Sequence, residues 1–212
     1  MFTGIIAAVG KISRVEQLEG GVRLCVDAGG LPLEDVALGD SIAINGACMT
    51  VIEKTATSFD VNVSRESLNC TTGLDGVMEV NLEKAMTLAE RLGGHLVSGH
   101  VDGIGAVHKF EAVGESWELV VEAPRELAKY LAFKGSVVVN GVSLTVNRVE
   151  DLGPGAERGC RFSINLIPHT VEVTTLKHLR AGARVNLEID LIARYVERML
   201  SLSNASLQTT AK

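Results

Sequence analysis

The chain has 212 residues, of which 46% are hydrophobic and 22% charged, and its net charge is −6. This balance is typical of a globular protein, and the acidic excess argues against nucleic acid or an anionic membrane as a partner. The start lacks a secretory signal pattern, and no stretch approaches the roughly 18 apolar residues of a membrane span. We therefore expect a cytoplasmic protein that binds a small neutral or weakly charged molecule, and neither nucleic acid nor a membrane.

Short strands are predicted through the first half of the chain. Apolar and polar residues alternate in short runs, as in Ser41–Ile44 and 61–63, and Gly, Asp or Asn interrupts the runs. Asn45-Gly46 predicts a tight hairpin turn, because both residues tolerate positive φ. Pro32 opens a predicted short helix over 32–36, since proline at the first helical position loses no hydrogen bond.

The second half repeats this arrangement with one longer loop. A strand is predicted over 117–121, a short helix over 124–131 and another Asn-Gly turn at 140–141. Fifteen residues separate Val146 from Phe162, whereas seven separate Val51 from Phe59. The excess predicts an exposed loop around 151–159, with no chemistry that we can assign to it.

The last segment is predicted to be an amphipathic helix over 190–203, followed by a disordered tail over 204–212. Its apolar stripe consists of Ile192, Tyr195, Met199 and Leu202, with charged residues between them. Such a stripe either packs on the protein's own strands or joins copies of the chain. The sequence leaves both alternatives open.

One folding unit occurs twice in the chain. Residues 41–51 return as 136–146, Gly4 returns as Gly99, and the Val-Asn-Leu-Glu segment 80–83 returns as 185–188. Because these echoes keep their order, the chain contains two similar units. The strand pattern predicts that each unit is a small antiparallel barrel, over 1–96 and 97–189.

The cysteines and histidines show no metal or disulfide pattern. The four cysteines are Cys25, Cys48, Cys70 and Cys160, and they contain no Cys-x-x-Cys pair. We interpret them as reduced thiols, all but Cys48 being small buried hydrophobic residues. His95 and His100 are five positions apart, which in a strand places them on opposite faces, so no metal site is expected.

Four fragments in order carry a resemblance to a known family. They are Met-Phe-Thr-Gly-Ile-Ile at 1–6, Asn-Gly-Ala-Cys-Met-Thr at 45–50, Gly-Gly-His-Leu-Val-Ser-Gly-His-Val-Asp at 93–102 and Asn-Gly-Val-Ser-Leu-Thr-Val at 140–146. With these fragments, the chain closely resembles the riboflavin synthase (alpha chain) family up to about residue 200. The resemblance implies an all-β fold of two tandem six-stranded Greek-key β-barrels with a C-terminal α-helix that joins three chains into a homotrimer.

The resemblance also implies an activity. Members of the family catalyse dismutation of two molecules of 6,7-dimethyl-8-ribityllumazine: a four-carbon unit passes from one to the other and gives riboflavin and 5-amino-6-(ribitylamino)uracil. No metal or organic cofactor is implied. The family's active sites lie between the N-terminal barrel of one subunit and the C-terminal barrel of its neighbour.

The same resemblance assigns substrate-binding residues to two pockets, one for each repeat. The first set is Phe2, Thr3, Gly4, Ile5, Ile6, Cys48, Met49, Thr50, Asn62, Val63, Ser64, Arg65, Glu66 and Ser67. The second set is Gly99, His100, Val101, Lys134, Ser143, Leu144, Thr145, Asn165, Leu166, Ile167, Pro168, His169 and Thr170. Two positions depart from the expected pattern. Met49 replaces Leu, and Asn62 stands where relatives can have Asp, which weakens any charged base there.

The candidate catalytic residues are Ser41, Cys48, His100, Ser143 and Asp190. All but Ser41, which matches Ser136, occupy positions that differ between the two copies. Cys48 aligns with Ser143 and is the candidate nucleophile or ring-positioning thiol, against the alternative of a packing thiol. His100 is the candidate proton shuttle, although a histidine bonded to backbone is commoner. Asp190 with Ser143 would orient water or hold a proton, unless Asp190 only caps the terminal helix.

Two other functions compete with this interpretation. Lumazine-type fluorescent proteins resemble the same family and bind the chromophore without turnover, but their second pocket loses residues that contact the ligand. Here both pockets keep Ser, Thr and Gly. A flavin reductase barrel would need a nicotinamide domain with a Gly-rich phosphate turn, which the sequence lacks. We therefore expect an enzyme.

Overall fold

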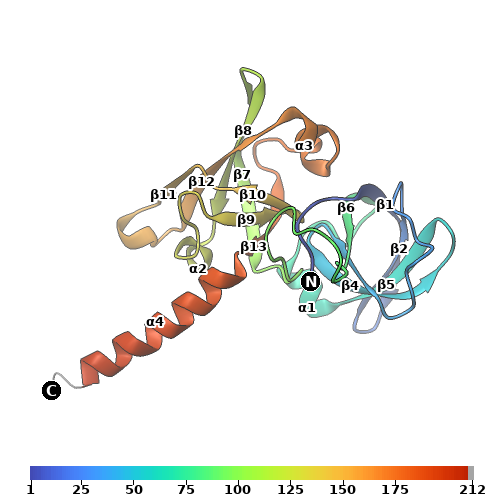
Figure 1. Ribbon diagram of the computed structural model, residues 1–212, viewed down its shortest axis with the longest axis horizontal. Coiled ribbons are helices and arrows are strands. Elements are labelled where there is room, and N and C mark those ends of the chain that lie inside the picture. The colour runs from blue at the N-terminus through green and yellow to red at the C-terminus, as the bar shows by residue number, and fades with distance from the viewer. Residues whose placement is uncertain (210–212) are drawn as a thin grey trace.

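Two β-domains lie side by side in a computed structural model of the chain, and a long helix projects from the second (Figure 1). The structure describes residues 1–209, with the side chains of 1–201. The N-terminus lies between the two domains. The all-β class expected from the sequence is confirmed.

The first domain is a closed antiparallel barrel. Its strands are β1 (Ala8–Leu18), β2 (Gly21–Asp27), β3 (Ser41–Ile44), β4 (Ala47–Lys54), β5 (Ser58–Ser64) and β6 (Met78–Lys84). Around the barrel they follow the order β1-β2-β5-β4-β3-β6, so the chain makes the long crossovers of a Greek key. Alternate side chains such as Leu24, Phe59 and Leu82 fill the interior and are fully buried.

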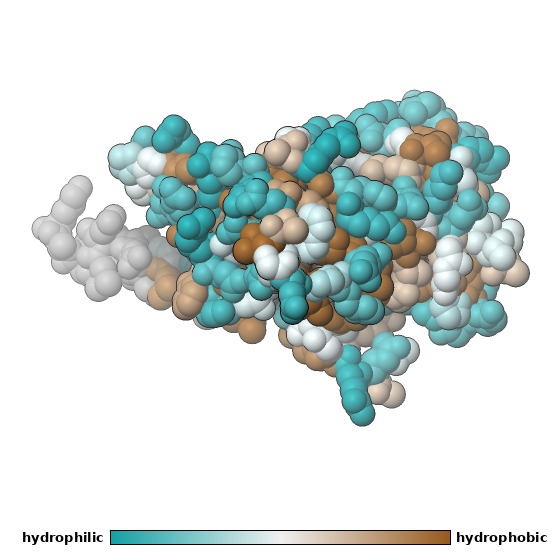
Figure 2. Space-filling model, turned by 90° about the horizontal axis from the view of Figure 1, so that it is seen from above, coloured by the Kyte–Doolittle hydropathy of each residue, from teal (hydrophilic) through white to brown (hydrophobic). Residues whose placement is uncertain are grey.

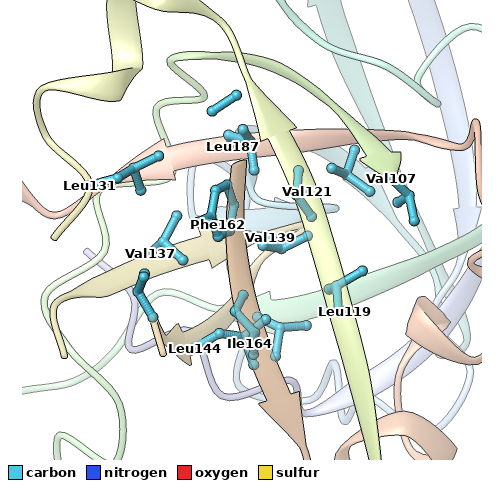
Figure 3. Close-up of a cluster of buried hydrophobic side chains, with 14 of the residues drawn as sticks. Val107, Leu119, Val121, Leu131, Val137, Val139, Leu144, Phe162, Ile164 and Leu187 are labelled. Carbon is cyan, nitrogen blue, oxygen red and sulfur yellow. The ribbon is translucent and has the colours of Figure 1, made fainter. Parts of the chain in front are cut away.

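The second domain repeats this order with seven strands instead of the expected six. They are β7 (Gly103–Val113), β8 (Ser116–Ala123), β9 (Ser136–Val139), β10 (Val142–Thr145), β11 (Arg148–Asp151), β12 (Cys160–Leu166) and β13 (Arg184–Ile189). Their order is β10-β9-β13-β7-β8-β12-β11, so β10 and β11 together replace β4. The break falls at 146–147, where the Asn147 N–H still donates to the Ser163 carbonyl at 2.8 Å. Figure 3 shows Val121, Val139, Phe162 and Leu187 converging in this curled sheet.

An approximate twofold arrangement joins the two barrels. Asn45 and Asn140 both have positive φ, 47° and 48°, which confirms the two Asn-Gly turns. The turns face each other so closely that a Cβ on Gly46 would lie 2.8 Å from the Gly141 nitrogen. Two buried amides cross between the barrels. Asn81 Nδ2 donates to the Asn140 carbonyl at 2.8 Å, and Asn186 Nδ2 donates to the Asn45 carbonyl at 3.0 Å.

The short helices agree with the sequence only in part. α2 (Arg125–Ala128) lies within the predicted 124–131, and the expected exposed loop contains the short η1 (Pro154–Ala156). α1 (Arg65–Cys70) follows β5, and α3 (Pro168–Glu172) with η2 (Thr175–His178) follows β12. The helix predicted over 32–36 is wrong: this segment is a turn, closed by a hydrogen bond from the Val36 N–H to the Leu33 carbonyl.

The terminal helix α4 (Leu191–Thr209) continues past the expected end at 203, so the predicted tail is helical as far as Thr209. Residues 210–212 lie outside the described residues. Ile192 and Tyr195 are each more than 60% exposed, so these two members of the stripe do not pack on the barrels, and the side chain of Leu202 lies outside the described residues. Ion pairs of Arg194 with Asp102 and of Glu197 with Lys129 attach the first turns of α4 to the second barrel.

The surface and the cysteines add three observations. Figure 2 shows a largely hydrophilic face in which apolar residues surface near the middle. No helix within the described part of the chain is long and apolar enough to cross a membrane. All four cysteines are free, but only Cys160 is buried; Cys25 is half-buried and Cys70 exposed, so their predicted burial is wrong.

Candidate functional site

The first pocket lies on the first barrel and is closed by a segment from the second repeat. Cys48 on β4 donates its N–H to the Gly99 carbonyl at 2.8 Å. A cleft of about 200 Å³ is lined there by Ala47, Cys48, Met49, Glu66, Ser67, Cys70, Thr71, Gly99, His100 and Val101. His100 is exposed and shares this cleft with Cys48. The sequence assigned Cys48 and His100 to different pockets, whereas the structure places both on one cleft.

The second pocket shows the reciprocal exchange. The Ser143 N–H on β10 donates to the Gly4 carbonyl at 2.8 Å. Residues 4–6 therefore begin at the pocket of the second barrel and not at that of the first. Gly4 therefore lies against the second barrel and Gly99 against the first, the reverse of the grouping expected from the sequence, whereas Phe2 packs in one buried cluster with Cys48 of the first barrel. The segments cross because Phe2 and Val97 pair with each other in an antiparallel bridge between the barrels.

Glycine is required at both crossing points. Gly4 and Gly99 have φ of +74° and +78°, a region that favours glycine. A Cβ on Gly99 would lie 2.7 Å from Cys48 Cβ, and one on Gly4 would lie 2.6 Å from Ser143 Cβ. The backbone at Gly99 and Gly4 therefore approaches Cys48 and Ser143 more closely than a residue with a side chain would permit.

The predicted residues at the ends of β5 and β12 divide between core and surface. Val63 and Leu166 are buried in their barrels, so their side chains do not face a pocket. Asn62, Ser64, Arg65, Asn165, Ile167, Pro168 and His169 are exposed. Ser64 caps α1 by accepting the Ser67 N–H at 3.1 Å. At the other end of α1, the contact with Glu66 raises the pKa of the Cys70 thiol.

Two other predicted residues have contacts of their own. Lys134 is exposed with a φ of +63°, and its Nζ donates to Asn147 Oδ1 at 3.2 Å. Ser41 pairs with Thr50 in the β3–β4 ladder. Ser41 also lines a neighbouring cleft of about 270 Å³ beside Lys84, apart from the cleft of Cys48.

A half-buried histidine that we had considered only as a metal ligand lies against Ser143. His95 Nδ1 is 2.7 Å from Ser143 Oγ, while its Nε2 is buried without a hydrogen-bond partner among the described residues. Burial lowers the pKa of His95, and the charge of Asp190 partly offsets this. Asp190 also caps α4 by accepting the Ile192 N–H at 2.9 Å. The glycine pair before His95 was the sequence signal of a close contact at this position. In the structure, a Cβ on Gly94 would lie 2.8 Å from Ser143 Cβ.

The strand geometry that we assumed for His95 and His100 is wrong. Residues 95–100 do not form a strand; Val97 alone makes an isolated bridge, to Phe2. Within the described part of the chain, no group of three or more His, Cys, Asp or Glu side chains is placed to hold a metal ion.

Comparison with known proteins identifies the family. A model of the lumazine binding domain matches residues 3–85 and again 98–190. The chain is 44% identical to the riboflavin synthase of Photobacterium phosphoreum over 94% of this chain and 89% of that one. It is 43% identical to that of Mycobacterium tuberculosis, over 94% and 98% of the two chains. The chain belongs to the riboflavin synthase family.

Solved structures support the same fold. A crystal structure of LumP complexed with riboflavin superposes with a TM-score of 0.75 at 24% identity, covering 89% of this chain and 99% of LumP. LumP complexed with 6,7-dimethyl-8-(1'-D-ribityl) lumazine gives a TM-score of 0.73 at 22% identity, with the same coverage. At this level of identity the likeness establishes the double-barrel architecture.

Proposed function

We propose that the chain is a riboflavin synthase, which converts two molecules of 6,7-dimethyl-8-ribityllumazine into riboflavin and 5-amino-6-(ribitylamino)uracil. The observation that carries this proposal is the pair of lumazine-binding units in one chain that is 38–44% identical to curated riboflavin synthases over nearly its whole length. Identity to LumP in the two superposed structures is 22–24%.

Each pocket binds one lumazine in this proposal. The first pocket uses Cys48, Met49, Thr50, the polar end of β5 with α1 (residues 62–67), and residues 99–101. The second uses residues 4–6, Lys134, Ser143, Leu144, Thr145 and residues 165–170. Thr50, within β4, and Thr145, at the end of β10, occupy equivalent positions of the repeat and are exposed, so their hydroxyls are available to a ring edge. The exposed polar residues after β5 and β12 suit the ribityl hydroxyls.

The proposed chemistry depends mainly on bringing two rings together. Fixing both reactants in register replaces a bimolecular encounter and is worth as much as roughly 7–11 kcal/mol when alignment is good. The reaction also needs a proton taken from the methyl group on C7 of one lumazine and a nucleophile for the partner ring. Cys48 supplies a nucleophilic or positioning thiol in the first pocket, with His100 beside it.

The second pocket supplies the complementary proton chemistry. His95, whose pKa burial lowers, favours its neutral form, and its Nδ1 contacts the Ser143 hydroxyl. A neutral imidazole accepts a proton near neutral pH. Asp190 stabilises the imidazolium that results, since its charge raises the pKa of His95. We therefore add His95 to the predicted catalytic residues.

The active enzyme is proposed to be a cytoplasmic homotrimer. Four apolar side chains of α4, those of Ile192, Tyr195, Val196 and Leu200, are 43–64% exposed. Such exposure is unfavourable in water and suits burial against equivalent helices of two other chains. In this assembly the first barrel of one chain faces the second barrel of its neighbour. The four free thiols fit a reducing compartment.

The test is to incubate the purified protein with the lumazine and to separate the products. We expect one riboflavin and one 5-amino-6-(ribitylamino)uracil for every two lumazines consumed. Tight binding of the lumazine without formation of riboflavin would instead assign the chain to the non-catalytic chromophore-binding class. Light scattering on the same sample tests the trimer, and a monomeric mass would reject it.

A further inference from the structure

Two buried glutamates hold the crossing segments, and the reaction scheme above does not use them. They end the Val-Asn-Leu-Glu echo: Glu83 is the penultimate residue of β6, and Glu188 that of β13. Their exposed fractions are 7% and 3%. We call residues 2–4 strap 1 and residues 97–99 strap 2.

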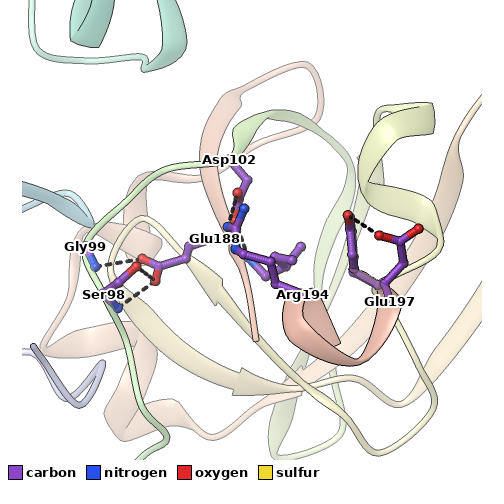
Figure 4. A network of polar contacts seen from close by, with 8 residues as sticks. Ser98, Gly99, Asp102, Glu188, Arg194 and Glu197 are labelled. Carbon is purple, nitrogen blue, oxygen red and sulfur yellow. Dashed lines mark hydrogen bonds and ion pairs between the residues drawn. The ribbon is translucent and has the colours of Figure 1, made fainter. Parts of the chain in front are cut away.

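The contacts of the two carboxylates repeat almost atom for atom. Glu83 Oε1 accepts the Thr3 N–H and the Thr3 hydroxyl, both at 2.7 Å, and Oε2 accepts the Gly4 N–H at 3.0 Å. Glu188 Oε1 accepts the Ser98 N–H at 2.7 Å and its hydroxyl at 2.6 Å, and Oε2 accepts the Gly99 N–H at 3.0 Å. We call each carboxylate with its three hydrogen bonds a clamp, and Figure 4 shows the clamp of Glu188.

A carboxylate is the side chain that this geometry requires. Three donors converge on one group and engage both oxygens, and only an ionised Asp or Glu presents acceptors alone. A glutamine would turn its NH₂ toward one of the strap N–H groups. Burial raises the pKa of both glutamates, and the hydrogen bonds from the straps act in the opposite direction.

Each clamp belongs to one barrel and serves the other. Glu83 lies in the first barrel and holds Gly4, whose carbonyl accepts the Ser143 N–H of the second barrel's pocket. Glu188 lies in the second barrel and holds Gly99, whose carbonyl accepts the Cys48 N–H of the first barrel's pocket. We propose that Glu83 and Glu188 are positioning residues that act crosswise, Glu83 on the pocket of Ser143 and Glu188 on the pocket of Cys48.

The second clamp also connects with the terminal helix. Asp102 Oδ2 accepts the N–H of Ile189, the neighbour of Glu188, at 2.9 Å, and Asp102 Oδ1 accepts Arg194 of α4 (Figure 4). Hydrogen bonds, together with the peptide bond between Glu188 and Ile189, therefore connect the base of α4 with strap 2 and Cys48. Through Glu188, the placement of α4 bears on the first pocket.

The first experiment measures amide hydrogen exchange in full-length Glu188→Gln and Glu83→Gln proteins. We expect Glu188→Gln to accelerate exchange about tenfold in peptides covering 46–52 and to leave the exchange of 141–147 unchanged. The reason is that one hydrogen bond to strap 2 is lost and the glutamine NH₂ faces an N–H group of the strap. Glu83→Gln should give the opposite pattern. Loosening of the same pocket by both variants, or of both pockets equally, would overturn the proposal.

A second measurement reports pocket occupancy, and it alone rests on the proposed function, through its use of riboflavin as the probe. Iodoacetamide labelling of Cys48, followed by peptide mass spectrometry, should be slowed by bound riboflavin in the wild type. Glu188→Gln should need about tenfold more riboflavin for equal protection, whereas Glu83→Gln should keep the wild-type value. Equal loss in the two variants would contradict the crosswise assignment.

Matched controls separate this effect from a general loss of charge or of folding. Glu53→Gln removes an exposed carboxylate on β4 that pairs with Arg23, and should change neither pocket. Ser98→Ala and Thr3→Val keep both glutamates and remove the hydroxyl donors, and Thr3→Val also removes the acceptor of the Ile5 N–H. Both variants should repeat the crosswise pattern with smaller effects even where a glutamine variant fails to fold. Wild-type protein that forms no riboflavin would reject the proposed function and leave the exchange test intact.

Discussion

The two barrels share their strand order but differ in how their pockets are closed. In the first barrel β4 is one strand, and Cys48 opens on a cleft that also contains the exposed His100. In the second barrel the same strand is split into β10 and β11, and Ser143 is covered by Gly94 and His95. The contacts that hold the straps are nevertheless equal to within about 0.1 Å. Duplication has thus kept the scaffold contacts alike while the reactive groups diverged, as a reaction between a donor and an acceptor requires.

The largest expected effect comes from breaking the contacts that the barrels share. Asn186→Ala removes the acceptor of the Thr72 N–H and the donor to the Asn45 carbonyl, and should lower the free energy of unfolding by about 3 kcal/mol. Asn81→Ala should cost a similar amount, because Thr175 and Asn140 lose the equivalent bonds. Urea denaturation with the exposed Asn69→Ala as control measures both, and clearly unequal losses would show that the two sides of the interface are not equivalent.

Making the two pockets alike at their point of difference tests the catalytic asymmetry. Cys48→Ser gives the first pocket the residue of the second, and we expect kcat to fall about tenfold or more while riboflavin affinity changes little. His100→Ala should act in the same direction. Steady-state kinetics and a riboflavin titration separate the two quantities, with Cys25→Ser as the control thiol variant. Affinity lost with turnover intact would make Cys48 a binding residue.

The buried thiol of the second barrel makes stability depend on alkaline pH. Burial raises the pKa of Cys160 from 9.0 to about 11. The folded protein retains this proton to higher pH than the unfolded chain, so the contribution to stability is complete below pH 9 and is lost as the pH rises through 11. At pH 10 the loss is about 1 kcal/mol. Denaturation curves at pH 8 and 10 should show a smaller alkaline loss for Cys160→Ala than for the wild type. Parallel losses would mean that other groups cause the effect.

His95 predicts the smallest effect, at the acid end. Burial lowers its pKa in the folded protein, so the unfolded chain binds the proton more readily and stability falls as the pH drops below 6.5. The charge of Asp190 offsets part of this effect, which keeps it small. Thermal unfolding of wild type and His95→Gln between pH 5 and 8 measures the difference. Equal slopes in the two proteins would mean that groups other than His95 cause the loss of stability at acid pH.

Much of the fold was accessible from local patterns. The alternation of Ser41–Ile44 and the Asn-Gly turns depend on residues adjacent in the chain, and the structure confirms them. The helix expected over 32–36 failed because its proline signal is equally compatible with a turn, and the barrel interior decided by burying Leu33 and Val36. The end of α4 was missed because polar composition alone does not exclude helix.

The sequence by itself determined that one unit is duplicated, that each copy is an antiparallel β-structure, and which positions of the copies are equivalent. Only the tertiary structure decided which of these positions meet. Gly4 contacts Ser143 and Gly99 contacts Cys48, although the repeat alone favours the opposite grouping. The physical reason is that a repeat records equivalence along the chain, whereas the exchange of straps depends on contacts through space between the barrels. The clamps of Glu83 and Glu188 and the contact of His95 with Ser143 are consequences of that exchange.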